Sequence, residues 1–442
     1  MGGEWTRVTL GGVSDRPQYG AIAKGGNEHA GPLFIRQTDI VSGRIDWNSV
    51  PRCDLAAEQV AKYLVHRGDI LVSRLGAGVG QAAVVRETNS AVFAGYLVRF
   101  QTRAELADAR FVSYQLQTQA WRDHVHGFRS GAAQPTLNAQ QMGAFAFHLP
   151  PLEDQRRIAH ILGTLDDKIE LNRRTNETLE AMARALYKSW FVDFDPVRAK
   201  AEGRAPTGMD AETAKLFPSE VVDSELGPIP KGWRVAPFEQ TFAIPLRNGL
   251  TKPKAIRGAG VFMINMGELF AHRRLGDVDM DRVPLSADER DKSLVATGDL
   301  LFARQSLTLQ GAGQCSIVRP ARESRTFESH LIRCRISETV GDPWFYFYYL
   351  TSRWGFERVG SIVEQVAAAG IRGSDLARLK LLMPPLSVQR EFANIVDTFE
   401  RRVDTALEES RELARVRDAL LPRLLSGELS VASAEQATEA TA

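Results

Sequence analysis

The chain has 442 residues, with 55 Lys and Arg against 54 Asp and Glu, and 44% of its residues are apolar. These proportions allow two or more globular domains and exclude a fibrous or wholly disordered chain. The sequence has no run of about 18 apolar residues and no signal-peptide pattern, so we expect a cytoplasmic protein outside the membrane. Its 3 cysteines lie far apart, which favours free thiols over a disulfide or zinc site.

Residues 1–150 predict a first domain of mixed structure. Apolar and β-branched runs bounded by turn residues indicate strands, and spaced aromatic residues indicate a helix. We place strands at 69–74, 82–86 and 96–100 and a helix near 111–126. The aromatic residues of that helix are expected to pack in the core rather than to stack on bases.

Two motifs of this domain could suggest a bound ligand. Gly76, Gly78 and Gly80 follow the first strand, but they lack the GxGxxG spacing, so we interpret them as a hairpin turn. His124 and His126 have no cysteine or acidic cluster nearby, so we place them on a helix surface and predict no metal site.

A Pro-Pro pair at 150–151 precedes a long helix, predicted as a central spacer at 151–192. Apolar residues recur every seven positions, which is typical of a coiled coil. One heptad position is occupied by Ile158, Leu165, Asn172, Leu179 and Leu186.

The remainder of the chain predicts the same order of elements. A connector at 193–230 leads to a second domain at 231–383, with a helix near 343–359, and to a C-terminal helical spacer at 384–427. Residues 231–275 contain eight Lys or Arg against two Glu, an excess that can attract phosphate. Residues 428–442 are small and polar, and we predict a disordered tail there.

The order repeats because the chain is duplicated. The segment from Leu149 to Arg156 reappears from Met383 to Arg390, at an offset of 234 residues. The second helix carries its own heptad position: Phe392, Phe399, Ala406, Leu413 and Leu420. We therefore predict an α+β fold with a pseudo-two-fold internal repeat.

The two helices need apolar partners, and the simplest partner of each is the other. An antiparallel pair would bring Asn172 near the small Ala406, where a lone Asn would set the register. Periodicity alone also allows a parallel pair. Helices of about 33 residues would hold two similar domains roughly 50 Å apart, which suits two sites on duplex DNA or a scaffold.

The chain resembles a type I restriction-modification specificity subunit over nearly its whole length. The resemblance is carried by 68–74, by 131–138, by the two Pro-Pro-Leu-x-x-Gln-Arg helix openings, and by 189–200 with the connector ending at Trp233. It implies two target recognition domains, each reading one half of a bipartite DNA site, separated by two long helices that form an antiparallel coiled coil and set the spacer.

The resemblance further implies a subunit without catalysis of its own. Its partners would be double-stranded DNA, two adenine-methylating modification subunits and, for cleavage, two translocating restriction subunits. S-adenosylmethionine, ATP and Mg²⁺ would belong to those partners. The outer helix faces would dock them through Arg173, Arg174, Glu177 and Glu180.

DNA contacts are expected from polar side chains at strand ends and in loops, because Arg pairs with guanine edges and Gln or Asn with adenine edges. In the first domain the candidates are Arg36, Gln37, Arg74, Gln81, Arg129 and Gln134. In the second domain they are Lys252, Lys254, Arg257, Asn265, Arg304, Gln305 and Arg372.

Two other functions are compatible with parts of the sequence. A self-contained DNA methyltransferase would be expected to show an Asn/Asp-Pro-Pro-aromatic motif for a flipped base, but the Pro-Pro pairs here follow Leu149 and Met383. A coiled-coil scaffold that does not bind DNA would need none of the candidate contacts.

Overall fold

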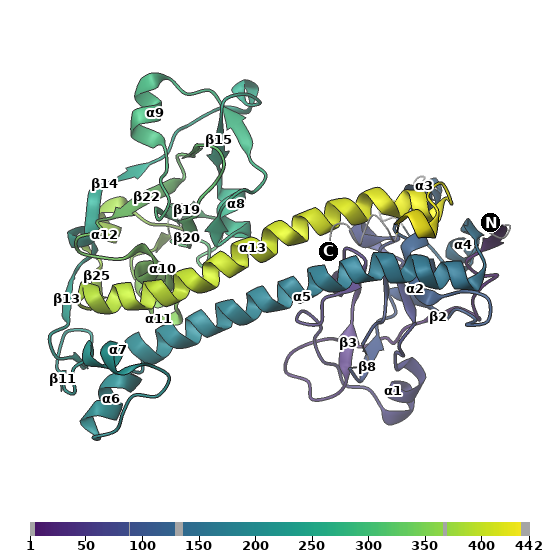
Figure 1. Ribbon diagram of the computed structural model, residues 1–442, viewed down its shortest axis with the longest axis horizontal. Helices are drawn as coiled ribbons and strands as arrows, with labels where there is room; N and C mark the ends of the chain where they lie inside the picture. Colours follow the sequence, from purple (N-terminus) through teal and green to yellow (C-terminus); the bar gives the residue numbers. More distant parts are fainter. Residues whose placement is uncertain (1–4, 88, 129–135, 366–368, 435–442) are drawn as a thin grey trace. The chain divides into compact units, whose positions relative to one another are not determined.

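The computed structural model describes residues 5–87, 89–128, 136–365 and 369–434. The chain divides into two compact units. The first comprises Met1–Arg173 with Ala406–Ala442, and the second comprises Arg174–Thr405. Each unit thus combines one globular part with a segment of each of two long helices, α5 (Leu152–Phe191) and α13 (Leu386–Leu425) (Figure 1).

The first unit is built around a four-stranded antiparallel sheet of order β2-β9-β6-β7. The predicted strands are confirmed as β6 (Ile70–Ser73), β7 (Ala82–Val84) and β9 (Leu97–Phe100), whose residues are all buried. Strand β2 (Gln18–Tyr19) forms one edge. Because both faces of the sheet are covered, the strands are nearly continuous apolar runs.

The other elements of the first unit surround this sheet. Short strands pair as β1 (Thr6–Thr9) with β10 (Ala146–Leu149), β3 (Leu33–Ile35) with β8 (Ala91–Phe93), and β4 (Ile40–Val41) with β5 (Arg44–Ile45). The helices are η1 (Gln37–Asp39), α1 (Ala57–Tyr63), η2 (Gly76–Gly78), α2 (Ala109–Gln115), α3 (Gln119–Gly127) and α4 (Ala139–Gly143).

The second unit repeats this topology. Its sheet has the order β14-β22-β18-β20-β16, in which β18 (Leu300–Ala303), β20 (Cys315–Val318) and β22 (Leu331–Ile336) take the places of β6, β7 and β9. Strands β14 (Phe242–Asn248) and β16 (Arg274–Leu275) form its edges. The internal repeat predicted from the sequence is therefore also a repeat of strand order.

The remaining strands of the second unit form small sheets. These are β13 (Arg234–Pro237) with β25 (Lys380–Met383), β15 (Val261–Ile264) between β17 (Asp281–Val283) and β21 (Arg325–Phe327), β24 (Ala369–Gly370) between β19 (Gln305–Ser306) and β23 (Glu364–Gln365), and β11 (Val221–Val222) with β12 (Ile229–Pro230). The helices are α6 (Asp195–Ala201), α7 (Ala211–Lys215), η3 (Phe238–Thr241), η4 (Lys254–Ile256), α8 (Met266–Ala271), α9 (Ala287–Ser293), α10 (Pro343–Thr351), α11 (Arg353–Gly360) and α12 (Gly373–Arg378).

The single helices predicted near 111–126 and 343–359 are each two helices. In the first pair α2 ends at Gln115, and Thr118 caps α3, accepting a hydrogen bond from the backbone N of Trp121 at 3.3 Å. In the second pair Ser352 both ends α10 and caps α11, accepting from the backbone N of Gly355 at 3.0 Å. A hydroxyl that can bond the backbone favours a cap over a helix interior, which explains both breaks.

The long helices pair antiparallel within each unit. In the first unit Ile158 of α5 shares a buried core with Leu420 and Leu424 near the end of α13. In the second unit Tyr187 of α5 packs against Phe392 near the start of α13, with ring centroids 5.8 Å apart. The predicted fold class, mixed helix and sheet with an antiparallel coiled coil, is confirmed.

Asn172 lies inside this pairing. Its side-chain Nδ2 donates to the carbonyl O of Ala406 at 3.3 Å, to Glu409 Oε2 at 2.8 Å and to Ser410 Oγ at 3.2 Å. A buried amide with three acceptors is satisfied only in one alignment of the two helices. The polar residue therefore specifies the register of the seam.

The predicted disordered tail begins too early. Residues 431–434 form a helical turn, Ala434 is fully buried, and Leu429 and Val431 pack against the core of the first unit. Although most of this segment is polar, its apolar residues Leu429, Val431 and Ala434 pack against the first unit. Residues 435–442 lie outside the described part of the chain.

Candidate nucleic-acid interface

The hairpin after β6 presents the first candidate, Arg74. Its backbone N donates to the carbonyl O of Tyr96 at 3.0 Å, and its own carbonyl O accepts from the N of Leu137 at 2.9 Å. The turn to β7 requires glycine at 80, because φ is +86° and a Cβ there would lie 2.8 Å from Val125 Cγ2. The predicted hairpin interpretation of the Gly-rich run is confirmed.

The guanidinium of Arg74 is held in place with no acidic partner among the residues that the structure describes. It lies over the ring of Tyr19, 5.0 Å from its centroid, and the Tyr19 hydroxyl accepts from the backbone N of Ala139 at 3.0 Å. Its buried Nε has no hydrogen-bond acceptor among the described residues. Stacking orients this cation while leaving its N–H groups unused.

Arg304 occupies the same position in the second unit. Its backbone N donates to the carbonyl O of His330 at 2.8 Å, and its carbonyl O accepts from the N of Ile371 at 2.9 Å. Its side chain is half-buried and, like that of Arg74, forms no ion pair within the ranges that the structure describes. The sequence repeat therefore brings one unpaired arginine to the same strand end in both units.

Four other predicted cations are already paired. Arg36 donates to Asp39 at 2.9 Å, which raises the pKa of its guanidinium, and Lys252 contacts Glu289 at 2.8 Å. Arg257 contacts Asp281 at 2.8 Å and Asn265 Oδ1 at 3.0 Å, and Arg372 contacts Glu364 at 2.7 Å. To contact DNA, each of these cations would first have to give up its present hydrogen-bond partner, which costs free energy. They are therefore weaker candidates for a primary DNA contact than an unpaired arginine.

The remaining DNA candidates differ in exposure. Gln81, Lys254 and Gln305 are exposed, whereas Gln37 is half-buried and its Oε1 accepts from Ser73 Oγ at 3.3 Å. Asn265 caps α8, and its Nδ2 donates to the carbonyl O of Met263 at 3.1 Å. Arg129 and Gln134 lie outside the described residues.

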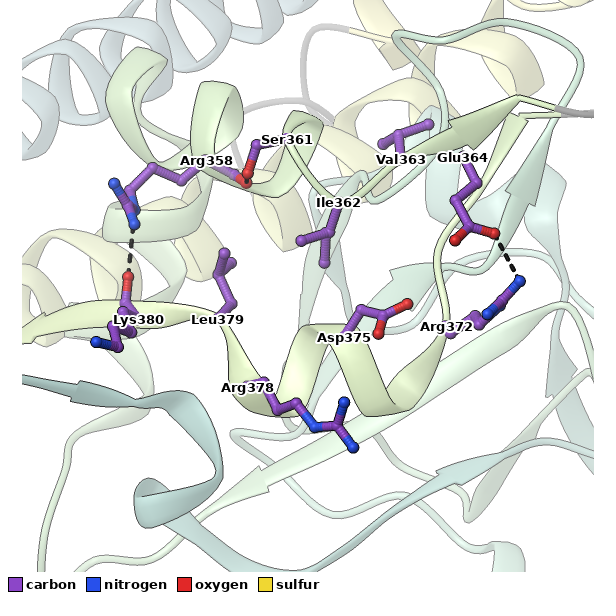
Figure 2. Close-up of a pocket in the computed structure, with 10 residues that line it drawn as sticks. All are labelled: Arg358, Ser361, Ile362, Val363, Glu364, Arg372, Asp375, Arg378, Leu379 and Lys380. Carbon is purple, nitrogen blue, oxygen red and sulfur yellow. Dashed lines mark hydrogen bonds and ion pairs between the residues drawn. The ribbon is translucent and has the colours of Figure 1, made fainter.

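A pocket of about 430 Å³ opens in the second unit beside β23 and α12. It is lined by Arg358, Ser361, Ile362, Val363, Glu364, Arg372, Asp375, Arg378, Leu379 and Lys380. Figure 2 shows Arg372 paired with Glu364 at one side and Arg358 bonded to the Lys380 carbonyl at the other, at 2.7 and 3.2 Å. Its cations are thus partly compensated and no single group dominates its charge.

The first unit has aromatic rings at the matching positions, 234 residues earlier. His124 corresponds to Arg358 and Phe128 to Ile362. The His124 ring stacks on Trp121 at 5.7 Å, and its Nε2 lies 2.8 Å from the Gln141 carbonyl O. Both histidines lie on α3, as predicted: His124 is half-buried in a ring cluster and His126 is exposed. No group of three metal-ligating side chains occurs among the described residues.

Comparisons with known proteins agree with this architecture. Residues 4–181 match the family described as Type I restriction modification DNA specificity domain. The chain is 25% identical to the Type I restriction enzyme HindI specificity subunit of Haemophilus influenzae, over 96% of this chain and 100% of the relative. Residues 4–181 thus carry a type I restriction-modification DNA specificity domain, and the chain as a whole is similar to type I specificity subunits.

Two further likenesses cover most of the chain. It is 23% identical to the Type I restriction enzyme MjaIX specificity subunit of Methanocaldococcus jannaschii, over 73% of this chain and 69% of the relative. The crystal structure of the type I S subunit from M. genitalium superposes with a TM-score of 0.56 at 14% identity, covering 95% of this chain and 96% of that one. The likeness to this crystal structure shows a shared fold.

The predicted partner-binding residues differ in exposure. Arg174 and Glu177 are exposed, and Arg173 is half-buried with Glu170 at 2.6 Å. Glu180 was expected on an outer face, but its carboxylate bonds Arg274 and lies 3.2 Å from the Tyr348 hydroxyl. Burial raises the pKa of Glu180, but the charges of Arg274 and Arg184 outweigh it and lower that pKa overall.

Sequence reasoning missed two networks that anchor the helices to the globular parts. In the first unit Asp166 of α5 accepts from the Tyr114 hydroxyl at 2.6 Å, from Arg86 at 3.1 Å and from Arg417 of α13 at 2.9 Å. The buried Glu400 of α13 holds the matching position in the second unit.

Glu400 accepts from Arg274 at 2.6 Å, and Arg274 also donates to the Tyr348 hydroxyl at 2.9 Å. Tyr114 and Tyr348 are 234 residues apart, as are Asp166 and Glu400. The repeat offset could have revealed these pairs, because a tyrosine and an acid recur together.

Proposed function

We propose that each globular part of this specificity subunit reads one half of a bipartite DNA sequence. The observation that carries the proposal is the pair Arg74 and Arg304, which occupy the same strand end and have no acidic partner among the described residues. An oriented guanidinium can donate two parallel hydrogen bonds to guanine O6 and N7. The paired cations nearby would supply the weaker, sequence-independent attraction to phosphate.

The two helices would fix the spacing of the half-sites and dock the partner subunits. We propose that two modification subunits bind the helices, with Arg174 and Glu177 as exposed contact residues, and that restriction subunits join for cleavage. In this proposal S-adenosylmethionine, ATP and Mg²⁺ act in those partners and this chain performs no catalysis.

We also propose that the complex works in the cytoplasm. Among the helices within the described ranges, none combines the length and apolarity needed to cross a membrane.

The test is to express the chain together with a modification subunit from the same organism and to map methylated adenines in the host genome. The expected result is a bipartite motif that becomes degenerate on one side in Arg74→Ala and on the other side in Arg304→Ala. Matched controls are Arg67→Ala and Arg353→Ala, which remove exposed arginines from the same two units.

A methylation pattern that does not depend on this chain would overturn the proposal and favour a scaffold. Binding of S-adenosylmethionine by the isolated chain would instead favour a self-contained methyltransferase. Either result is visible without knowing the recognised sequence beforehand.

A further inference from the structure

Exposed apolar side chains lie on the loops next to Arg74 in the first unit. Tyr19 is 41% exposed, Tyr96 57% and Ile22 97%. We call Tyr19, Ile22, Arg74 and Tyr96 the Arg74 patch. Single exposed apolar residues are common, but a cluster around an unpaired cation marks a contact surface.

The patch is rigid, because hydrogen bonds join its two loops. The Gly95 N donates to the Ala21 carbonyl O at 2.7 Å, and the Ala21 N donates to the Phe93 carbonyl O at 2.8 Å. Gly20 permits this approach, since a Cβ there would lie 2.3 Å from the Phe93 carbonyl O. Ile22 lies over Gly95, because a Cβ added at Gly95 would be 3.6 Å from the Cγ1 atom of Ile22. A surface held in this way loses little conformational entropy on binding.

The second unit has the same backbone without the apolar side chains. Its Leu250 N donates to the Phe327 carbonyl O at 2.9 Å, and its Ser329 N donates to the Leu250 carbonyl O at 3.0 Å, as in the first unit. Polar, exposed residues then stand at the three matching places: Asn248 for Tyr19, Thr251 for Ile22 and His330 for Tyr96. The fold therefore does not require the apolar patch.

We infer that Ile22 and Tyr96 form a binding site for the 5-methyl group of a thymine next to the guanine that Arg74 reads. This inference rests on the proposed function. Apolar side chains recognise thymine in the major groove through this methyl group, which lies on the same base edges as guanine O6 and N7. The half-site of the first unit would then contain a thymine beside a guanine, on either strand.

The test measures binding of the complex of this chain with its modification subunits to duplexes that carry the mapped motif. Each thymine of the first half-site is replaced in turn by deoxyuridine, which lacks only the methyl group. One replacement is expected to weaken binding about fourfold, the effect of burying one methyl group. Ile22→Ala should weaken binding of the thymine duplex by a similar factor and show no further loss with deoxyuridine.

Two controls isolate the patch. Leu106→Ala removes an apolar side chain that is 42% exposed and lies beyond the other end of β9 from Arg74. Deoxyuridine in the second half-site should act equally on the wild type and on Ile22→Ala. Because Ile22 is almost fully exposed, its truncation should leave the fold intact, and Tyr96→Ala provides a second variant.

The outcomes separate the two proposals. If the complex binds none of the duplexes with sequence specificity, the proposed function is rejected. Specific binding combined with a first half-site that lacks thymine, or with no response to deoxyuridine, would reject the inference alone. Equal weakening of thymine and deoxyuridine duplexes by Ile22→Ala would also reject it, and would indicate contact with another part of the DNA.

Discussion

Arg74 and Arg304 sit on equivalent strand ends, yet their surroundings differ. Tyr19, Ile22 and Tyr96 give the first unit an aromatic and aliphatic surface, whereas polar residues replace them in the second. The two units share strand order, helix caps and helix anchors. Residues that hold the fold are thus separate from residues that can read a base, which lets one framework serve two different half-sites.

The helix anchors give the largest expected effect. Glu400 is 2% exposed and neutralises Arg274, so Glu400→Gln should lower the free energy of unfolding by about 3 kcal/mol. Asp166→Asn should lower the free energy of unfolding by less, because the Asp166 side chain is 18% exposed. Urea unfolding measures both, with the exposed Glu338→Gln as control. Equal losses would show that burial does not distinguish the two anchors.

The unpaired arginines come next. Arg74→Lys keeps the charge but removes the planar pair of donors, so the preference for guanine in the first half-site should fall about 10- to 100-fold. The second half-site should be unaffected, and Arg304→Lys should show the reverse. Competition binding with duplexes altered in one half-site measures this ratio. A loss spread over both half-sites would contradict separate reading.

For Asp342, which caps α10, we expect an effect on the free energy of unfolding that depends on pH. Burial raises its pKa to about 6 from 3.8, so the folded state binds the proton more tightly than the unfolded state. Stability from this group is present below pH 3.8 and is lost as the pH rises to about 6.

Asp342→Asn keeps the cap without the charge. It should be more stable than the wild type at pH 7.5 by about 1 to 3 kcal/mol, the upper figure being the full value of the pKa change, with little difference near pH 4. Thermal unfolding at both pH values tests this. A constant difference between the two proteins would contradict titration of Asp342.

Arg372 should show the smallest effect on stability. Its ion pair with Glu364 is exposed, so Arg372→Ala should change the free energy of unfolding by less than about 0.5 kcal/mol. If Arg372 contacts a phosphate, the same variant should reduce the slope of log affinity against log salt by about 1. An unchanged slope would exclude Arg372 from the phosphate contacts.

Patterns between nearby residues, and the duplication that relates the two halves, were readable from the sequence. The heptads after each Pro-Pro pair, the strands at 69–74, 82–86 and 96–100, and the partnership of Asn172 with Ala406 follow from periodicity and duplication. The candidate site was less readable. The sequence indicated Arg74 and Arg304, but not that Arg36 and Lys252 are paired, nor that Tyr19, Ile22 and Tyr96 gather beside Arg74.

The tertiary structure decided these features because they depend on groups far apart in the chain. Lys252 and Glu289 are 37 residues apart, and Arg274 and Glu400 are 126 apart. No local pattern encodes such pairs, so the inward turn of Glu180 and the packing of Val431 could not be foreseen. Periodicity and duplication determined the helices and the repeat, while folding decided which charges are neutralised and which remain available to a ligand.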